Sequence, residues 1–174
     1  MLVQETTLHM LCGKIAAGKS TLAGRLADAP ATLLISEDYW LARLYGEEQR
    51  TVADYIRNSR RLRDAMGGHV EALLRAGLSV VLDFPANTVA TRRWMRGICD
   101  DAGVGHRLHV LDVPDDVCRA RLRARNAAGT HEFAASDSEF DLIAGYFQPP
   151  SAQEEFTVVN HRDTQPDDQA GDRS

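Results

Sequence analysis

A stretch near the start of the chain limits the folds that the rest can adopt. Residues 13–20 read Gly-Lys-Ile-Ala-Ala-Gly-Lys-Ser, which fits the pattern G-x-x-x-x-G-K-[ST] of a phosphate-binding loop. The apolar run 8–12 predicts a buried strand before it, and apolar residues at helical spacing in 21–27 predict a helix after it. The glycines let several backbone N–H groups point at one anion, and the helix N-terminus adds partial positive charge. The stretch therefore predicts a nucleotide-binding site.

The spacing of this loop assigns a task to two of its side chains. We expect the Lys19 ammonium to reach the β- and γ-phosphates and the Ser20 hydroxyl to bind Mg²⁺. The expected cofactors are therefore ATP and Mg²⁺. The residues expected to hold the nucleotide here are Gly13, Lys14, Ala16, Ala17, Gly18, Lys19, Ser20 and Thr21.

The composition is that of an ordinary globular domain, and it narrows the partners. Of the 174 residues, 26% are charged and 44% are hydrophobic, which suits one domain with a core. No apolar run approaches the ~20 residues of a membrane span, and no signal-peptide pattern is visible. The cysteines follow no disulfide or metal-site spacing, so we expect a cytoplasmic location. Residues 126–174 are net acidic, which argues against an extended nucleic-acid surface but leaves a nucleic-acid 5′-end open.

Strand-like and helix-like segments alternate along the chain. This alternation predicts an α/β fold of the P-loop NTPase type, a three-layer sandwich with a central five-stranded parallel sheet. We expect a single domain at 1–161 with a lid near 119–135, followed by a disordered acidic tail at 162–174. The expected strands are 8–12, 31–35, 78–82, 106–111 and 156–160, and the expected helices are 21–27, 41–46, 51–76, 88–102, one that starts at 114 and ends before a loop at 126–135, and 136–147.

Acidic residues stand where the second and third expected strands end. Because ligands bind at the carboxyl ends of such strands, Asp38 and Asp83 should face the same crevice as the γ-phosphate. Residues 80–83, Val-Val-Leu-Asp, are typical of a strand whose Asp helps to hold Mg²⁺, so Asp83 is a candidate metal ligand beside Ser20. The alternative for each carboxylate is a helix N-cap, although Ser36 could cap the helix near Asp38 instead.

Arginines near the expected lid are candidates for contacts with the nucleotide. Arg121 and Arg125 lie four residues apart on one helical face, and we expect them to close over the nucleotide. Arg119 and Arg123 lie on another face and are expected to be solvated.

The segment between the second and third strands should select the phosphate acceptor. Arg57 and Arg60 share a helical face that could grip an anionic acceptor, or that could be a solvated face with ion pairs. Trp40 could stack on a ring of the acceptor or pack in the core. The residues alone leave these alternatives open.

The motifs described so far resemble those of a known family. The chain looks like the small P-loop kinases grouped with bacteriophage polynucleotide 5′-kinase, chloramphenicol phosphotransferase and the zeta-toxin kinases, a branch also described as AAA-type ATP-binding proteins. The resemblance covers residues 8–160. It depends on Asp38-Tyr39-Trp40 after the second strand, on Asp83 with Asn87 after the third, and on Val-Leu-Asp-Val-Pro at 110–114 followed by Arg121, Arg125 and Asn126.

This resemblance implies roles for the residues of the crevice. Asp38 would act as the general base that takes the proton of the attacking acceptor hydroxyl. Asp83 would orient the acceptor, or the metal through water, and Asn87 would lie on the acceptor side. Arg121 and Arg125 would clamp ATP and stabilise the transition state.

Three functions are consistent with these patterns. The favoured one is an ATP-dependent phosphotransferase that acts on a hydroxyl group of a small-molecule acceptor. A polynucleotide 5′-hydroxyl kinase is the first alternative, but Leu41 stands where the phage-type pattern has an arginine. A nucleotide-binding regulatory module, or a slow ATPase without an acceptor, is the second alternative and predicts no pocket beyond the γ-phosphate.

Overall fold

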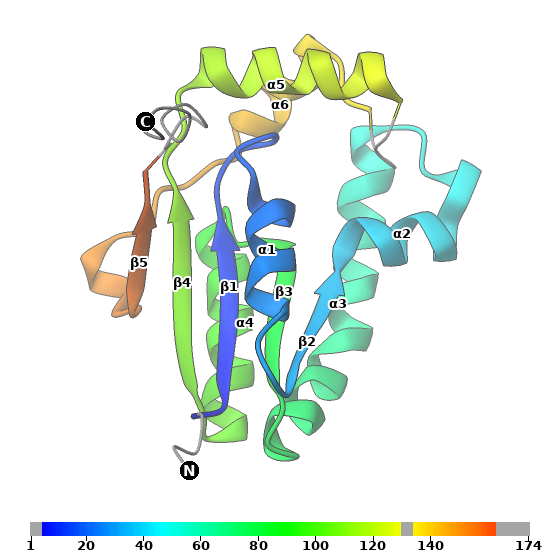
Figure 1. The fold of residues 1–174 in the computed structure, drawn as a ribbon. Coiled ribbons are helices and arrows are strands. Elements are labelled where there is room, and N and C mark those ends of the chain that lie inside the picture. The colour runs from blue at the N-terminus through cyan, green and yellow to red at the C-terminus, as the bar shows by residue number, and fades with distance from the viewer. Residues whose placement is uncertain (1–4, 130–133, 163–174) are drawn as a thin grey trace, which may run out of the picture.

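A sheet of parallel strands forms the centre of the molecule, with helices on both faces (Figure 1). The computed structural model describes residues 5–129 and 134–162. The strands are β1 (Thr7–Cys12), β2 (Thr32–Ser36), β3 (Ser79–Pro85), β4 (Gly105–Leu111) and β5 (Val158–His161). Their order in the sheet is β2-β3-β1-β4-β5, and every neighbouring pair is parallel.

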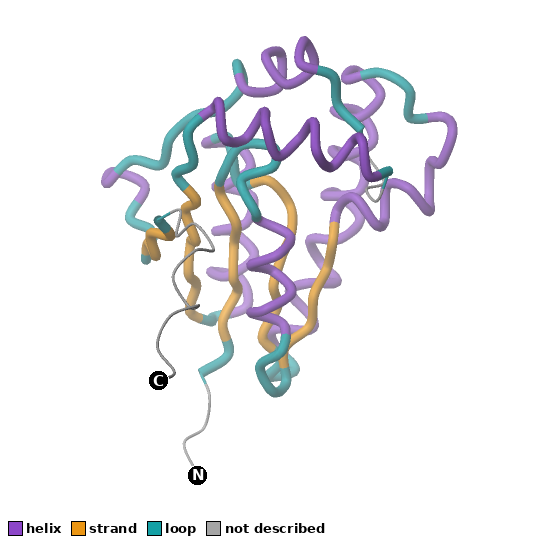
Figure 2. The backbone as a smooth tube through the Cα atoms, turned by 45° about the horizontal axis from the view of Figure 1, so that its top comes forward, coloured by secondary structure: helices purple, strands orange, loops and turns teal. Residues whose placement is uncertain are grey.

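The helices complete a three-layer sandwich. They are α1 (Lys19–Ala27), α2 (Glu37–Tyr45), α3 (Val52–Arg75), α4 (Val89–Ala102), α5 (Asp115–Ala128) and α6 (Asp137–Ala144). α1 covers one face of the sheet, α3 and α4 pack side by side on the other, and α5 crosses above the carboxyl ends of the strands (Figures 1 and 2). In the part of the chain described, no helix is long and apolar enough to cross a bilayer. The predicted α/β fold with five parallel strands is confirmed.

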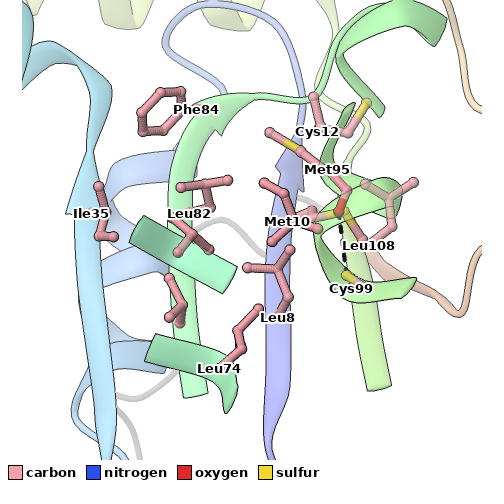
Figure 3. Close-up of a cluster of buried hydrophobic side chains, with 14 of the residues drawn as sticks. Leu8, Met10, Cys12, Ile35, Leu74, Leu82, Phe84, Met95, Cys99 and Leu108 are labelled. Atoms are coloured by element: carbon pink, nitrogen blue, oxygen red, sulfur yellow. Dashed lines mark hydrogen bonds between the residues drawn. The ribbon is translucent and has the colours of Figure 1, made fainter. Parts of the chain in front are cut away.

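Alternation along β1 builds a core on each face of the sheet. Leu8 and Met10 join the large buried cluster under α3 and α4, together with Leu82 of β3 (Figure 3). Leu11 points to the opposite face, because successive strand side chains alternate, and packs with Ala23 of α1. A strand that is covered on both faces is mostly apolar, which explains the run at 8–12.

Local hydrogen bonds explain where the predicted helices begin. Thr51 caps α3: its hydroxyl accepts the Asp54 N–H at 3.1 Å, and the Asp54 carboxylate accepts the Thr51 N–H at 3.0 Å. Ser136 and Glu139 form the same capping box at α6. Both helix starts were expected from the sequence.

The start of α2 and the end of β3 differ from the expected boundaries. α2 begins at Glu37, directly after β2, because the Ser36 hydroxyl accepts the Tyr39 N–H at 3.3 Å and caps the helix. Asp38 therefore lies in the first turn of a helix and is not its cap. β3 runs beyond Asp83 to Pro85, where a turn was expected, since its pairing with β1 shifts register and then continues.

The expected lid and tail are only partly described. α5 extends to Ala128, so Asn126 is helical and not part of a loop. Residues 130–133 of the lid and 163–174 of the tail lie outside the described residues.

The cysteines are buried free thiols. Burial raises the pKa of Cys12 to about 11 and that of Cys99 to about 12, and Cys118 is fully buried. Thiols with raised pKa values are poor nucleophiles at neutral pH, so these residues belong to the core.

A buried arginine ties the C-terminal segment to the sandwich. Arg92 of α4 is completely buried, and its Nε and Nη2 donate to the two carboxylate oxygens of Glu154 at 2.7 and 2.9 Å. Its Nη1 donates to the carbonyl oxygens of Ala86 and Gln148, each at 2.9 Å. This network fixes the segment that leads into β5.

Removal of this guanidinium should destabilise the protein strongly. We expect Arg92→Ala to lower the free energy of unfolding by about 3–5 kcal/mol, because it leaves a carboxylate and two carbonyls without their charged partner. Chemical denaturation measures this change. Arg93→Ala is the matched control, since Arg93 is exposed on the same helix and should change stability by less than about 0.5 kcal/mol. Equal losses in the two variants would contradict the assignment.

Candidate active site

A cavity of about 900 Å³ opens at the carboxyl ends of the strands, beside α5. Its walls come from the phosphate-binding loop, the first turns of α1 and α2, the end of β3, one face of α3 and the inner face of α5. Of the residues predicted from the sequence, those on its walls are Ala16, Ala17, Gly18, Lys19, Ser20, Thr21, Asp38, Asp83, Asn87, Arg121 and Arg125.

The loop has the backbone geometry that its glycines predict. Gly18 has φ +100° at the N-cap of α1, a left-handed conformation that favours glycine. The Lys19 ammonium donates to the carbonyl oxygens of Gly13 at 2.6 Å and Lys14 at 2.8 Å, so it lies against the loop. Burial lowers the pKa of Lys19, and the nearby Asp83 carboxylate acts in the opposite direction.

Gly13 is held by a side chain from beyond β3. The Gly13 N–H donates to Asn87 Oδ1 at 2.9 Å, and Asn87 Nδ2 donates to the Gly13 carbonyl at 2.8 Å. A Cβ atom at position 13 would lie 3.0 Å from the Leu111 carbonyl oxygen, which explains why this position is glycine. Asn87 thus supports the loop, and the acceptor contact predicted for it stays a prediction. Gly13 and Lys14 do not line the cavity, and Lys14 forms an ion pair with Asp115.

The two predicted carboxylates reach the cavity by different routes. Asp38 projects from the first turn of α2. Asp83 lies at an irregularity of β3, where Met10 pairs with Leu82 but the next residue of β1, Leu11, pairs with Pro85. Such a bulge redirects a side chain near the end of a strand.

The residues on the wall suit a magnesium ion. The Ser20 hydroxyl and the Asp83 carboxylate both line the cavity beside the loop, and oxygen ligands of this kind are the ones Mg²⁺ prefers. The described residues contain no group of three or more His, Cys, Asp or Glu side chains arranged to hold a metal, so these two would bind the ion together with phosphate oxygens.

The arginines of α5 divide between its two faces, as their spacing predicts. Arg121 and Arg125 line the cavity, and burial lowers the pKa of Arg125, while the charge of Asp38 acts in the opposite direction. Arg119 forms an ion pair with Asp141 of α6, and Arg123 pairs with another carboxylate of the same helix. α6 therefore holds α5 in place with its inner arginines over the cavity.

Glu37 is a buried acid that the sequence analysis did not single out. It is 2% exposed, and its carboxylate accepts hydrogen bonds from the Tyr55 hydroxyl at 2.7 Å and from the Ser59 hydroxyl. Burial raises its pKa to about 7, those two hydrogen bonds lower it, and Asp38 adds a smaller raising effect. A glutamate just before the candidate base was visible in the sequence, but only the packing of α3 against α2 buries it.

One face of α3 forms a wall of the cavity. Its members follow helical spacing: Val52, Tyr55, Ile56, Ser59 and Arg63.

The residues predicted from this region to bind the acceptor lie elsewhere. Arg57 is exposed and pairs with Asp54 at 2.7 Å, and Arg60 is exposed. Trp40 is 37% exposed and packs edge-on against Tyr39. None of these three predicted side chains is on the cavity wall, whereas Arg63 is.

Three histidines form a hydrogen-bonded row across β1, β4 and β5. His109 lies 3.0 Å from His9 (Nε2 to Nδ1) and 2.9 Å from His161 (Nδ1 to Nε2). Burial and the two neighbouring rings lower the pKa of His109 to about 4, so it is neutral near pH 7. The row links the three strands, and its outer member His161 also lines the cavity.

Comparison with known proteins shows the family and the fold to which this chain belongs. A family model described as an AAA domain matches residues 8–150. The chain belongs to this AAA-domain family. No curated protein matches the sequence.

Solved structures extend the likeness to almost the whole chain. A candidate kinase from Chloroflexus aurantiacus has a TM-score of 0.74 at 19% identity, and covers 94% of this chain and 88% of its own. Kti12 from Chaetomium thermophilum, in complex with ADP-AlF3, has a TM-score of 0.69 at 17% identity, and the match covers 94% of this chain and 92% of Kti12. The APS kinase of Mycobacterium tuberculosis, in complex with AMPPNP and APS, has a TM-score of 0.59 at 20% identity, and the match covers 92% of this chain and 90% of the APS kinase chain. These likenesses show that the AAA-domain chain has the kinase-like P-loop fold.

The amide of Asn87 should be needed for a nucleotide-ready loop. We expect Asn87→Leu to raise the Kd for ATP by up to roughly 30-fold, because two hydrogen bonds worth about 1 kcal/mol each no longer hold Gly13. Isothermal titration calorimetry measures the Kd. Asn160→Leu is the control, since Asn160 is exposed on β5. An unchanged Kd for Asn87→Leu would contradict the supporting role.

Burial of Glu37 should make stability depend on pH. Its pKa is about 7 in the folded chain against an ordinary 4.5, so the carboxyl is protonated in both states at low pH. Between pH 4.5 and 7, Glu37 ionises in the unfolded chain before it ionises in the folded one. The free energy of unfolding of the wild type therefore falls by up to about 3 kcal/mol as the pH rises, a loss that Glu37→Gln does not share. Thermal unfolding from pH 4 to 8 should show the stability of Glu37→Gln rising relative to that of the wild type as the pH increases. The stability of Glu48→Gln, a change at an exposed site, should follow the wild-type curve in parallel. Parallel curves for Glu37→Gln would contradict the raised pKa.

Proposed function

We propose that this protein is a phosphotransferase that moves the γ-phosphate of ATP to a hydroxyl group of a small-molecule acceptor. The observation that supports this most is that one cavity holds the phosphate-binding loop and the side chains of Asp38, Asp83, Arg121 and Arg125. Its volume of about 900 Å³ has room for a nucleotide and a second small molecule.

The donor half of the reaction needs alignment and positive charge. The N–H groups of the loop and of α1 cradle the phosphates, and Lys19 contacts the β- and γ-phosphates. Ser20 and Asp83 would hold Mg²⁺, which would supply positive charge to the phosphate oxygens.

The acceptor half needs a base. Asp38 takes the proton of the acceptor hydroxyl while its oxygen forms a bond to the γ-phosphorus, and the bond from that phosphorus to the bridging oxygen of ADP breaks. Arg121 and Arg125 balance the charge on the transferred group from above. Ser36, and not Asp38, is the N-cap of α2.

Two observations favour a small acceptor over the alternatives. A slow ATPase needs no space beyond the γ-phosphate, yet the cavity continues along α3. A polynucleotide 5′-kinase of the phage type has an arginine at the position of Leu41, and this leucine is buried, with 1% of its surface exposed. Among the structural neighbours, the APS kinase and a gluconokinase from Sinorhizobium meliloti are both named for small acceptors.

The three buried free thiols fit a cytoplasmic location.

Replacement of the base should separate binding from transfer. We expect Asp38→Asn to keep the Kd for ATP within about 2-fold and to lower transfer by roughly 10²–10⁴, the usual contribution of a general base. The assay is a screen of hydroxyl-bearing metabolites and antibiotics for an ATP-dependent mass gain of one phosphate, followed by rates on each product.

Lys19→Ala is the second arm of this experiment, and it should abolish both nucleotide binding and transfer. Full transfer by Asp38→Asn would remove Asp38 as the base. Full transfer by Lys19→Ala would overturn the phosphotransferase assignment as a whole.

A further inference from the structure

Arg63 is a charged side chain on the acceptor wall that the reaction described above does not use. It lies on the cavity face of α3, one turn after Ser59 and two turns after Tyr55. α3 and α4 pack side by side (Figure 1), and Thr88 and Thr91 from the start of α4 line the same cavity. The guanidinium therefore lies where the two helices meet at the cavity.

A neutral partner holds Arg63 in this position. Its Nη1 donates to the Thr91 hydroxyl at 2.7 Å. Thr91 is buried and is itself fixed by Thr88, whose hydroxyl accepts the Thr91 N–H at 3.1 Å and lies 2.9 Å from the Thr91 hydroxyl. Thr91 orients the guanidinium without neutralising its charge.

Arg63 lacks the carboxylate partner that several other arginines of the described residues have. Residues 5–129 and 134–162 provide no carboxylate within ion-pair distance of Arg63. Six other arginines in these ranges each form an ion pair with Asp or Glu, namely Arg57, Arg75, Arg92, Arg96, Arg119 and Arg123.

The surroundings suggest what would complete the site. Glu37 of α2 is an acid whose pKa the Arg63 charge lowers slightly, but its carboxylate oxygens already accept hydrogen bonds from Tyr55 and Ser59. A guanidinium has five N–H donors in a planar fork, which matches the oxygens of a carboxylate or phosphate. An anion bound here would be charge-assisted and partly shielded from water.

We propose that Arg63, held by Thr91, binds an anionic group of the acceptor, so that the substrates are hydroxyl compounds that carry a carboxylate or a phosphate. This inference rests on the proposed function. It also separates Arg63 from Arg57 and Arg60, the arginines favoured by the sequence, which lie on other faces of α3.

The test is a titration of the protein with its loop already filled. Saturating AMPPNP and Mg²⁺ occupy the phosphate-binding loop, so that added anions cannot bind there. Glycerate, glycerol 3-phosphate and glycerol are then titrated and followed by ¹H–¹⁵N NMR, since they share a backbone and differ in the anionic group. We expect at least one of the two anions to bind at least 10-fold more tightly than glycerol, and the stronger one identifies the anionic group.

Variants assign the binding to a side chain. Arg63→Gln should raise the Kd of the anion roughly 10- to 100-fold, the range for hydrogen bonds to a charged group, and leave the Kd of glycerol unchanged. Arg93→Gln is the control, since Arg93 is exposed on α4 and does not line the cavity. The inference is overturned if neither anion is preferred to glycerol, or if Arg60→Gln and not Arg63→Gln removes the preference.

A purely structural role of Arg63 predicts a different pattern. Thr91→Val removes the hydrogen bond between the two helices but keeps the positive charge. It should retain a preference for the anion, whereas a structural role requires Thr91→Val and Arg63→Gln to lose it equally. Thermal unfolding of each variant shows whether the fold is intact.

The outcomes also distinguish this inference from the proposed function. Anion binding through Arg63, with no acceptor phosphorylated in the screen, supports the inference and counts against the phosphotransferase. Phosphorylation of a neutral acceptor by Arg63→Gln at the wild-type rate supports the phosphotransferase and overturns the inference.

Discussion

The active edge of this molecule depends on the pairing between the Asn87 side chain and the backbone of Gly13. β1 and β3 pair as parallel strands, and the Ala86 N–H still donates to the Leu11 carbonyl at 2.8 Å after their register shifts. The Asn87 amide then supplies a donor and an acceptor to Gly13, as a neighbouring strand would. This side chain extends the sheet by one step into the loop. The bulge that allows it also brings Asp83 to the cavity beside the loop.

Charges around the cavity follow from the elements that carry them. Asp38 comes from the first turn of α2 and Asp83 from the end of β3, whereas Arg63 comes from α3 and Arg121 and Arg125 come from α5. Phosphoryl transfer needs positive charge around the moving group and a base on the acceptor side, and this arrangement supports both. Glu37 is neutral through much of the acid range because it is buried, so it adds little repulsion to Asp38 below about pH 7.

Much of the fold and the donor half of the site could be predicted from local patterns. The loop motif, the apolar strands and the capping boxes at Thr51 and Ser136 depend on residues only a few positions apart. The face assignment of Arg121 and Arg125 also followed from helical spacing alone. The start of α2 could not be predicted as well, because Ser36 and Asp38 were both candidate caps and only the backbone geometry distinguishes them.

The sequence by itself determined that this chain forms a parallel α/β sheet with a phosphate-binding loop, because periodicity and the glycine–lysine spacing are local properties. Only the tertiary structure decided which side chains of α3 line the cavity. Arg57, Arg60 and Arg63 look alike in sequence, and their roles separate once the rotation of α3 against α4 turns Arg63 alone into the cavity. Asn87 became a support of the loop for the same reason, since its partner Gly13 lies 74 residues away in the chain.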